Sequence, residues 1–345
     1  MSVTRRCPVC ADGHATGRLT IDENMFGISE QFDYLTCADC DSLFIEEVPT
    51  DLAPYYDTSA YYSFDDDPAA TMGRPVVKQV VARVGSSILL GDGSPALGAV
   101  AAMGPRPLRT LISILRSVRR AGLPRGQDTR ILDVGAGSGT LIYALDLAGM
   151  RNVTGIDPFT GGDRSVGERT RLLRRDLAEI DDEFDLVMFH HSLEHVPDPG
   201  ETLVQARRLL SPEGRVLVRM PTVASEAYDR YGTAWIGCDA PRHLTIPSRK
   251  GMRRLCARSG YDIRSVVDDS NESRFWASEQ YRAGVPLVAD RSHFVDPRRS
   301  PFTRRQIHRW QREAAQLNAT NRGDQAAWIL TPAMSPKDDV EQSSP

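Results

Sequence analysis

The chain has 345 residues, of which 41% are hydrophobic and 26% charged, as in an ordinary globular protein of one large or two modest domains. Its formal net charge of −4 gives no support for a general nucleic-acid-binding or membrane-surface role, because both use a basic face. The sequence has no secretory signal and no apolar stretch that could span a bilayer. We therefore expect a cytoplasmic protein with reduced cysteines.

Residues 1–48 contain two cysteine pairs and little else that could form a core. The pairs Cys7/Cys10 and Cys37/Cys40 both have CxxC spacing. Each pair can bring two thiolates to one ion, and two pairs complete the tetrahedron that zinc prefers. The pattern predicts a small zinc ribbon whose closed, four-thiolate site is structural and not catalytic. A disulfide pair and a module without metal are the alternatives.

Residues 49–125 have a mixed composition. They begin with a run that contains Tyr55, Tyr56, Tyr61 and Tyr62. They end with apolar residues at helical spacing between residues 108 and 118, with arginines in between. We expect a helical lid or linker region between the cysteine module and the rest of the chain.

Residues 126–275 alternate strand and helix patterns. The runs TRILDV, NVTGID, FDLVMFH, GRVLVRMP and YDIRSVVDD indicate strands, and helical patterns separate most of them. Strands spaced by helices of this length predict βαβ units and a doubly wound, mostly parallel sheet. Beyond Asn271 the pattern weakens, so residues 276–345 are expected to form a C-terminal extension with a disordered tail.

A glycine-rich turn directly follows the first of these strands. Asp133 leads it, and Gly135, Gly137 and Gly139 form a GxGxG spacing before a helix. Asp157 ends the next strand, where a carboxylate can accept both hydroxyls of a ribose. A dinucleotide would place its pyrophosphate at this turn and requires the spacing GxGxxG, which differs from the one present. An acidic residue beside the negatively charged pyrophosphate would also be unfavourable. By contrast, the carboxylate of Asp133 would help to hold a ligand with an ammonium or sulfonium group.

The pattern DxGxGxG with a later acidic residue resembles the class I S-adenosylmethionine-dependent methyltransferases over about residues 125–270. The resemblance implies a Rossmann-like α/β sheet of seven strands, with S-adenosylmethionine as cofactor. It places Asp176, followed by Leu177, near the adenine amino group, and Pro158 and Phe159 on the adenine face. A helix N-cap is the alternative role for Asp176.

The segment FHHSLEHVPDP resembles the part of this family that comes after the fourth strand and lies beside the methyl group and the substrate. His190 is thereby placed at the cofactor, and His191, Glu194 and His195 are candidate bases. Alternatively, they cap the next helix or line the pocket wall. The HxxEH spacing also matches a metallopeptidase pattern. That interpretation is disfavoured because the segment follows a buried strand and is stopped by prolines.

A second cluster, W-x-G-x-D-x-P-R-H, resembles a run in bacterial methyltransferases encoded with polysaccharide and sugar-modifying genes. The resemblance places Trp235 and Arg242 at the substrate, with Arg242 binding an anionic group such as a phosphate, and His243 as the base. The alternative is a local pair between Arg242 and Asp239, with a packed histidine.

In similar proteins the tyrosine-rich segment closes over the cofactor as a lid, which implies substrate contacts for Tyr56 and Tyr62; ordinary packing is the alternative. The order of the modules, with a zinc module before a methyltransferase, is also similar to that of sugar C-methyltransferases that act on nucleotide-linked sugars. This chain is shorter and lacks their full C-terminal domain.

The sequence therefore predicts an enzyme that transfers a methyl group to a small-molecule or glycan-linked acceptor, a nucleotide sugar among them. One alternative is an RNA-modifying methyltransferase, against which the acidic net charge and the lack of a lysine-rich patch argue. Another is a non-catalytic, cofactor-binding protein whose zinc module docks a partner. No nucleic-acid partner is expected, and the oligomeric state is not predicted.

Overall fold

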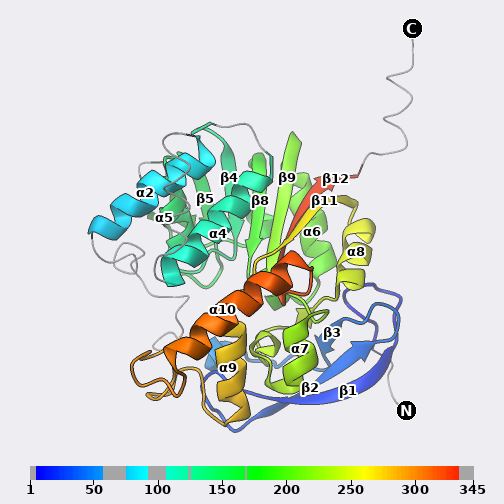
Figure 1. Ribbon diagram of the computed structural model, residues 1–345. Coiled ribbons are helices and arrows are strands. Elements are labelled where there is room, and N and C mark those ends of the chain that lie inside the picture. The colour runs from blue at the N-terminus through cyan, green and yellow to red at the C-terminus, as the bar shows by residue number, and fades with distance from the viewer. Residues whose placement is uncertain (1–4, 57–74, 92–105, 123–125, 168, 334–345) are drawn as a thin grey trace.

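The computed structural model describes residues 5–56, 75–91, 106–122, 126–167 and 169–333 (Figure 1). Its centre is an eight-stranded mixed sheet with the order β11-β12-β9-β8-β4-β5-β7-β6. The strands are β4 (Arg130–Val134), β5 (Asn152–Ile156), β6 (Arg164–Ser165), β7 (Arg171–Leu173), β8 (Phe184–His190), β9 (Leu210–Pro221), β11 (Tyr261–Asp268) and β12 (Gln325–Pro332).

Two strands of this sheet run against the others. β12 is antiparallel to both β9 and β11, and β6 is antiparallel to β7, whereas β7, β5, β4, β8 and β9 are parallel neighbours. The sheet therefore has eight strands and not the seven expected, because the two-residue β6 extends one edge. β12 lies inside the sheet although its residues come after the range 126–275 assigned to the methyltransferase fold.

Helices cover both faces of the sheet (Figure 1). On one face, α2 (Pro75–Leu89), α4 (Arg106–Arg120) and α5 (Thr140–Leu147) share a buried cluster with β4, β5 and β8. On the other face lie α6 (Pro199–Arg208) and α8 (Arg249–Arg258). This two-sided cover explains why the parallel strands are nearly continuous apolar runs.

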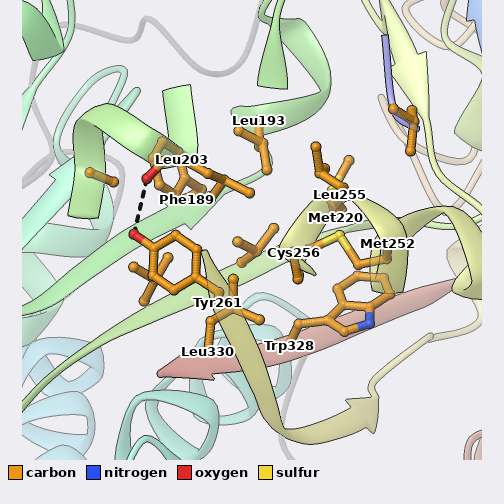
Figure 2. Packing of buried hydrophobic residues seen from close by; sticks show 14 of the residues in the cluster. Phe189, Leu193, Leu203, Met220, Met252, Leu255, Cys256, Tyr261, Trp328 and Leu330 are labelled. Carbon is orange, nitrogen blue, oxygen red and sulfur yellow. Dashed lines mark hydrogen bonds between the residues drawn. The ribbon is translucent and has the colours of Figure 1, made fainter. Parts of the chain in front are cut away.

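The core beneath α6 and α8 fixes the end of β8, where candidate site residues begin. Figure 2 shows Phe189, Tyr261 and Trp328 packed in this cluster, with the Tyr261 hydroxyl donating to the carbonyl of Leu203 at 3.0 Å. That bond satisfies the one polar group of a side chain that is only 2% exposed. The strand that carries His190 is thus held rigidly.

The cysteine-containing segment forms a second, antiparallel sheet with the order β1-β2-β3-β10. Its strands are β1 (Ala15–Asp22), β2 (Gln31–Cys37), β3 (Leu43–Ile45) and β10 (Thr245–Ile246). β10 comes from the long loop after β9, so the N-terminal ribbon receives one strand from the larger domain. The four cysteines also belong to the same buried cluster as Leu255 of α8. The small segment therefore shares the core of the larger domain.

The remaining helices lie between the two sheets and in the C-terminal part (Figure 1). They are α7 (Glu226–Tyr231), α9 (Ser273–Arg282) and α10 (Arg304–Ala319), with the 3-10 turns η1 (Ala53–Tyr56), η2 (Leu177–Glu179), η3 (Leu193–His195), η4 (Gly232–Ala234) and η5 (Ile236–Cys238). The expected C-terminal extension thus contains two helices and a sheet strand, while its expected disordered tail lies outside the described residues. No helix in the described parts of the chain is long and apolar enough to cross a membrane.

Candidate functional site

The turn after β4 has the backbone geometry that its glycines predict. Gly135, Gly137 and Gly139 have φ angles of 75°, 54° and 81°, in the left-handed region that favours glycine. A Cβ on Gly135 would also lie 2.5 Å from the Cβ of Ser192. The Gly135 amide donates to the carbonyl of Ile156 at 2.9 Å, which ties the turn to the end of β5.

Two buried carboxylates flank this turn. Asp133 is 2% exposed, and its Oδ1 has no hydrogen-bond partner among the described residues. Burial and the charge of Asp157 raise the pKa of Asp133 to about 8. Asp157 accepts the amides of Gly137 and Phe159, each at 2.9 Å, although burial still raises its pKa. The turn therefore offers an unused carboxylate oxygen where a cationic ligand group would be favoured.

The residues expected at an adenine lie around the same strand ends. Phe159 is 81% exposed, and Pro158 is half-buried directly after Asp157. Asp176 occupies the N-cap position of η2, and its backbone amide donates to the Glu179 carboxylate at 2.7 Å. Leu177 packs against the core below α6 and α8. The adenine contacts of these residues stay predictions.

The histidines after β8 are organised by an arginine of the neighbouring strand. Arg219 Nη1 lies 2.9 Å from His191 Nε2 and 3.4 Å from His190 Nε2, while its Nε pairs with Asp269 at 2.5 Å. A guanidinium only donates, so His191 Nε2 accepts, and His191 Nδ1–H donates to Glu194 Oε1 at 3.1 Å. Burial and the nearby Arg219 charge lower the pKa of both histidines well below its usual range. With both nitrogens engaged, His191 orients Glu194.

Glu194 and two histidines meet in a buried cluster. Glu194 is 0% exposed, and its Oε2 has no partner among the described residues. His243 Nδ1–H donates to the carbonyl of Gly237 at 2.8 Å, so His243 Nε2 is the ring nitrogen that faces the carboxylates. That nitrogen lies 3.9 Å from Glu194 Oε1 and 3.7 Å from Asp239 Oδ2. The rings of His195 and His243 are 4.9 Å apart, edge to face.

Tyr56, from the tyrosine-rich segment, reaches this cluster. Its hydroxyl lies 2.8 Å from His195 Nδ1. Burial lowers the pKa of His195 to about 4 and raises that of Tyr56, so both groups are neutral. The structure thus joins one expected lid residue to one expected base. Tyr61 and Tyr62 lie outside the described residues.

Trp235 and Arg242 do not have the substrate contacts that the sequence suggested. The Trp235 ring is 0% exposed, and its Nε1 donates to Asp324 Oδ2 at 2.8 Å. Arg242 is also 0% exposed, and it pairs with Asp239 at 2.7 Å and with Glu23 at 2.9 Å. The expectation of an anion-binding Arg242 is therefore corrected. The local Arg242–Asp239 pair that was the alternative is present.

Arg242 also lowers the pKa of a neighbouring acid. Although burial opposes its ionisation, Arg242 and the nearby histidines lower the pKa of Asp239 to about 2. The third guanidinium nitrogen, Nη1, donates to the carbonyl of Tyr55 at 3.1 Å. Arg242 thereby holds the loop after β9 against the ribbon and against the residue that precedes Tyr56.

The four cysteines of the ribbon come together as predicted. The Cys7 and Cys40 sulfurs are 3.7 Å apart, and those of Cys10 and Cys37 are 3.6 Å apart, with all four thiols buried and unoxidised. Four sulfurs at zinc's bond length of ~2.3 Å lie about 3.8 Å from one another in a tetrahedron. The donor set and its spacing fit a closed zinc site.

Sequence reasoning missed Arg219 and its partner Asp269. The available signal was a charged residue near the end of a buried strand, in GRVLVRMP, where an unpaired arginine would be unfavourable. Arg219 is 3% exposed, and only the folded sheet places the histidines of β8 beside it.

The segment that contains this site is similar to a known protein family. Residues 108–266 match the profile of a protein family described as a methyltransferase domain. This stretch of the chain is therefore similar to methyltransferase domains. The match begins in α4 and ends in β11, so it includes the glycine turn, Asp157 and the histidines after β8.

Two curated relatives share parts of this segment. The chain is 27% identical over 191 residues to a tRNA U34 carboxymethyltransferase of Aeromonas salmonicida, covering 48% of this chain and 54% of that protein. It is 37% identical over 98 residues to a ubiquinone biosynthesis O-methyltransferase of Pseudomonas syringae pv. tomato, covering 25% and 42%. A solved geranyl diphosphate methyltransferase in complex with SAM is 15% identical, with a TM-score of 0.42 over 71% of this chain and 94% of that one. The chain spans about half the length of the curated relatives it matches.

Proposed function

We propose that the chain is an S-adenosylmethionine-dependent methyltransferase acting on a small-molecule or glycan-linked acceptor. The observation that carries the proposal is the buried Asp133 carboxylate beside the glycine turn, one oxygen of which has no partner in the part of the chain that the structure describes. S-adenosylmethionine has an ammonium and a sulfonium group, and a buried carboxylate attracts such charges. A pyrophosphate at the same turn offers no positive charge to that carboxylate.

In this proposal the residues divide into two groups around the turn. Asp133, Asp157 and the glycines hold the cofactor, which supplies the methyl group. Holding reactants in line contributes about 7–11 kcal/mol to such displacements. His195 and His243, beside Glu194, lie on the acceptor side and are the candidates to take its proton, because Arg219 and Glu194 already engage both nitrogens of His191.

The acceptor class has two sources of support. The ubiquinone biosynthesis O-methyltransferase relative favours a small acceptor with a hydroxyl group. The sugar-directed alternative depends on the order of the chain, with a cysteine ribbon before the methyltransferase-like stretch, and the cysteine geometry supports a structural zinc ion. We retain a cytoplasmic setting as part of the proposal, because four reduced thiols suit a reducing compartment.

RNA is a second candidate acceptor. A tRNA-modifying relative favours it, and so does the C-terminal part of the chain. Between residues 290 and 312 there are seven arginines against two aspartates, and all seven arginines are exposed. Arg305, Arg309 and Arg312 share one face of α10. The absence of a lysine-rich patch in the sequence is thus no argument against binding of a polyanion, since arginines supply the basic surface.

The cofactor assignment is tested by titration calorimetry of the zinc-replete protein with S-adenosylhomocysteine and, separately, with NAD. We expect binding of the first ligand and none of the second; the reverse result would overturn the proposal. Asp157→Ala is expected to weaken the affinity at least tenfold, whereas the matched variant at an exposed acid, Asp163→Ala, leaves it unchanged. Retardation of tRNA in a gel, lost on replacing Arg305, Arg309 and Arg312 by alanine, would favour the RNA acceptor.

A further inference from the structure

The cluster of Glu194, His195 and His243 contains donors that the proposed cofactor does not use. The three residues come from two separate segments, η3 after β8 and the loop after η5. One donor atom from each lies within 4.8 Å of the others, and the cluster is buried or half-buried. Oxygen and imidazole nitrogen donors in this two-histidine, one-carboxylate set suit divalent transition cations.

Hydrogen bonds outside the cluster leave its donor atoms free to bind. His243 Nδ1–H donates to the carbonyl of Gly237, so His243 Nε2 is the ring nitrogen that faces the cluster. His191 holds Glu194 Oε1 in place, while Glu194 Oε2 has no partner among the described residues. Tyr56 fixes the ring of His195 through Nδ1. Metal-binding histidines generally have their second nitrogen held in this way.

The charges around the cluster do not balance. Glu194 is 0% exposed, and among the described residues its only ion-pair partners within 4.0 Å are histidines. Arg242 is already shared by Glu23 and Asp239. A buried carboxylate without a cation is costly, and a bound divalent ion would compensate it.

We propose that Glu194, His195 and His243 form a second metal site, for a divalent transition cation, separate from the cysteine site. Asp239 Oδ2, 3.7 Å from His243 Nε2, lies close enough to share a water with that ion. Resting on the proposed function, the ion binds an oxygen of the acceptor and lowers its pKa, so that the acceptor's proton passes to water and the two histidines act as metal ligands in place of the base role. The cluster is adjacent to the cofactor turn, since the Ser192 hydroxyl donates to the carbonyl of Val134 at 2.5 Å.

The test uses Mn²⁺, which prefers oxygen and nitrogen donors to four thiolates. Mn²⁺ is titrated, without cofactor or acceptor, into the full chain carrying one zinc ion per chain, so that zinc fills the cysteine site alone, and free Mn²⁺ is measured by electron paramagnetic resonance. We expect one Mn²⁺ per wild-type chain, and at least tenfold weaker binding in Glu194→Gln and His243→Asn. The asparagine can still donate to Gly237, so the loop contact is preserved. His308→Asn, at an exposed histidine of α10, is the matched control and should bind as the wild type does.

No Mn²⁺ binding by the wild type, or equal binding by wild type, Glu194→Gln and His243→Asn, would overturn the metal site. The absence of Mn²⁺ binding is measured on the wild type alone, so this result does not depend on whether a variant folds. S-adenosylhomocysteine binding is measured on the same samples. If that ligand binds while Mn²⁺ does not, the metal site fails and the methyltransferase assignment stands.

Discussion

The two acids beside the glycine turn differ in their partners. Asp157 accepts two backbone amides, whereas Asp133 has an oxygen with none among the described residues. Because of this difference, the ionisation of Asp133 should change more than that of Asp157 when a cationic ligand binds. Asp133 is protonated below its raised pKa of about 8 and ionised above it. The charge of a bound S-adenosylmethionine favours the ionised form.

We therefore predict that cofactor affinity rises with pH between pH 6 and 8, and levels off above the pKa of Asp133. The rise is at most about tenfold per pH unit, because one proton leaves on binding. Calorimetry of the wild type and Asp133→Asn across this range measures it, and the ratio of the two affinities cancels the ligand's own titration. A ratio that stays constant from pH 6 to 9 would exclude Asp133 from cofactor binding.

Which residues could be assigned from sequence depends on how local their partners are. The glycine turn, Asp133 and Asp157 were recognised by their spacing within two neighbouring strands. Arg242 could not be assigned, because one of its partners, Glu23, is 219 positions away. From its neighbours alone it looked like a ligand for a substrate anion. Only the folded chain shows that its guanidinium is buried and fully paired.

Among the larger elements, the ribbon depends on both its cysteines and a borrowed strand. The buried cysteines share a core with α8, and β3 pairs with β10. Ser248, the N-cap of α8, also bonds to the carbonyl of Cys40. Loss of zinc should therefore loosen β10 and the start of α8 as well as the ribbon.

We predict that Cys37→Ser abolishes zinc binding and speeds amide hydrogen exchange in residues 31–45 and 244–252. Cys256→Ser replaces another buried thiol that is not a ligand, so it should keep one zinc per chain and the slow exchange. Zinc is quantified by atomic absorption, and exchange by mass spectrometry. Full zinc content in Cys37→Ser would contradict the assigned site.

The strands of the large sheet show which elements can be predicted from sequence patterns alone. The parallel strands were recognised because helices separate them at regular spacing. β12 was missed because it enters the sheet antiparallel, without a crossover helix, after a long and irregular segment. Its apolar run AAWIL, bounded by Gly323 and Pro332, was the available signal for a buried strand.

In the molecule as a whole, the N-terminal part of the chain contributes side chains to the candidate site, most of which comes from the larger domain. Tyr34 of β2 donates to the carbonyl of His243 at 2.9 Å, and Tyr56 contacts His195. Arg242 joins both regions through Glu23 and the carbonyl of Tyr55. The ribbon thus forms part of the wall around the candidate base residues.

Arg242 should consequently be a main stabilising contact between the two sheets. We predict that Arg242→Met lowers the free energy of unfolding by about 3–5 kcal/mol, because it leaves Glu23 and Asp239 buried without their cation. Arg322→Met removes an exposed arginine that also pairs with two acids, Glu226 and Asp229, and should cost less than about 1 kcal/mol. Urea denaturation followed by tryptophan fluorescence measures both. Equal losses in the two variants would mean that the buried network does not hold the ribbon to the larger domain.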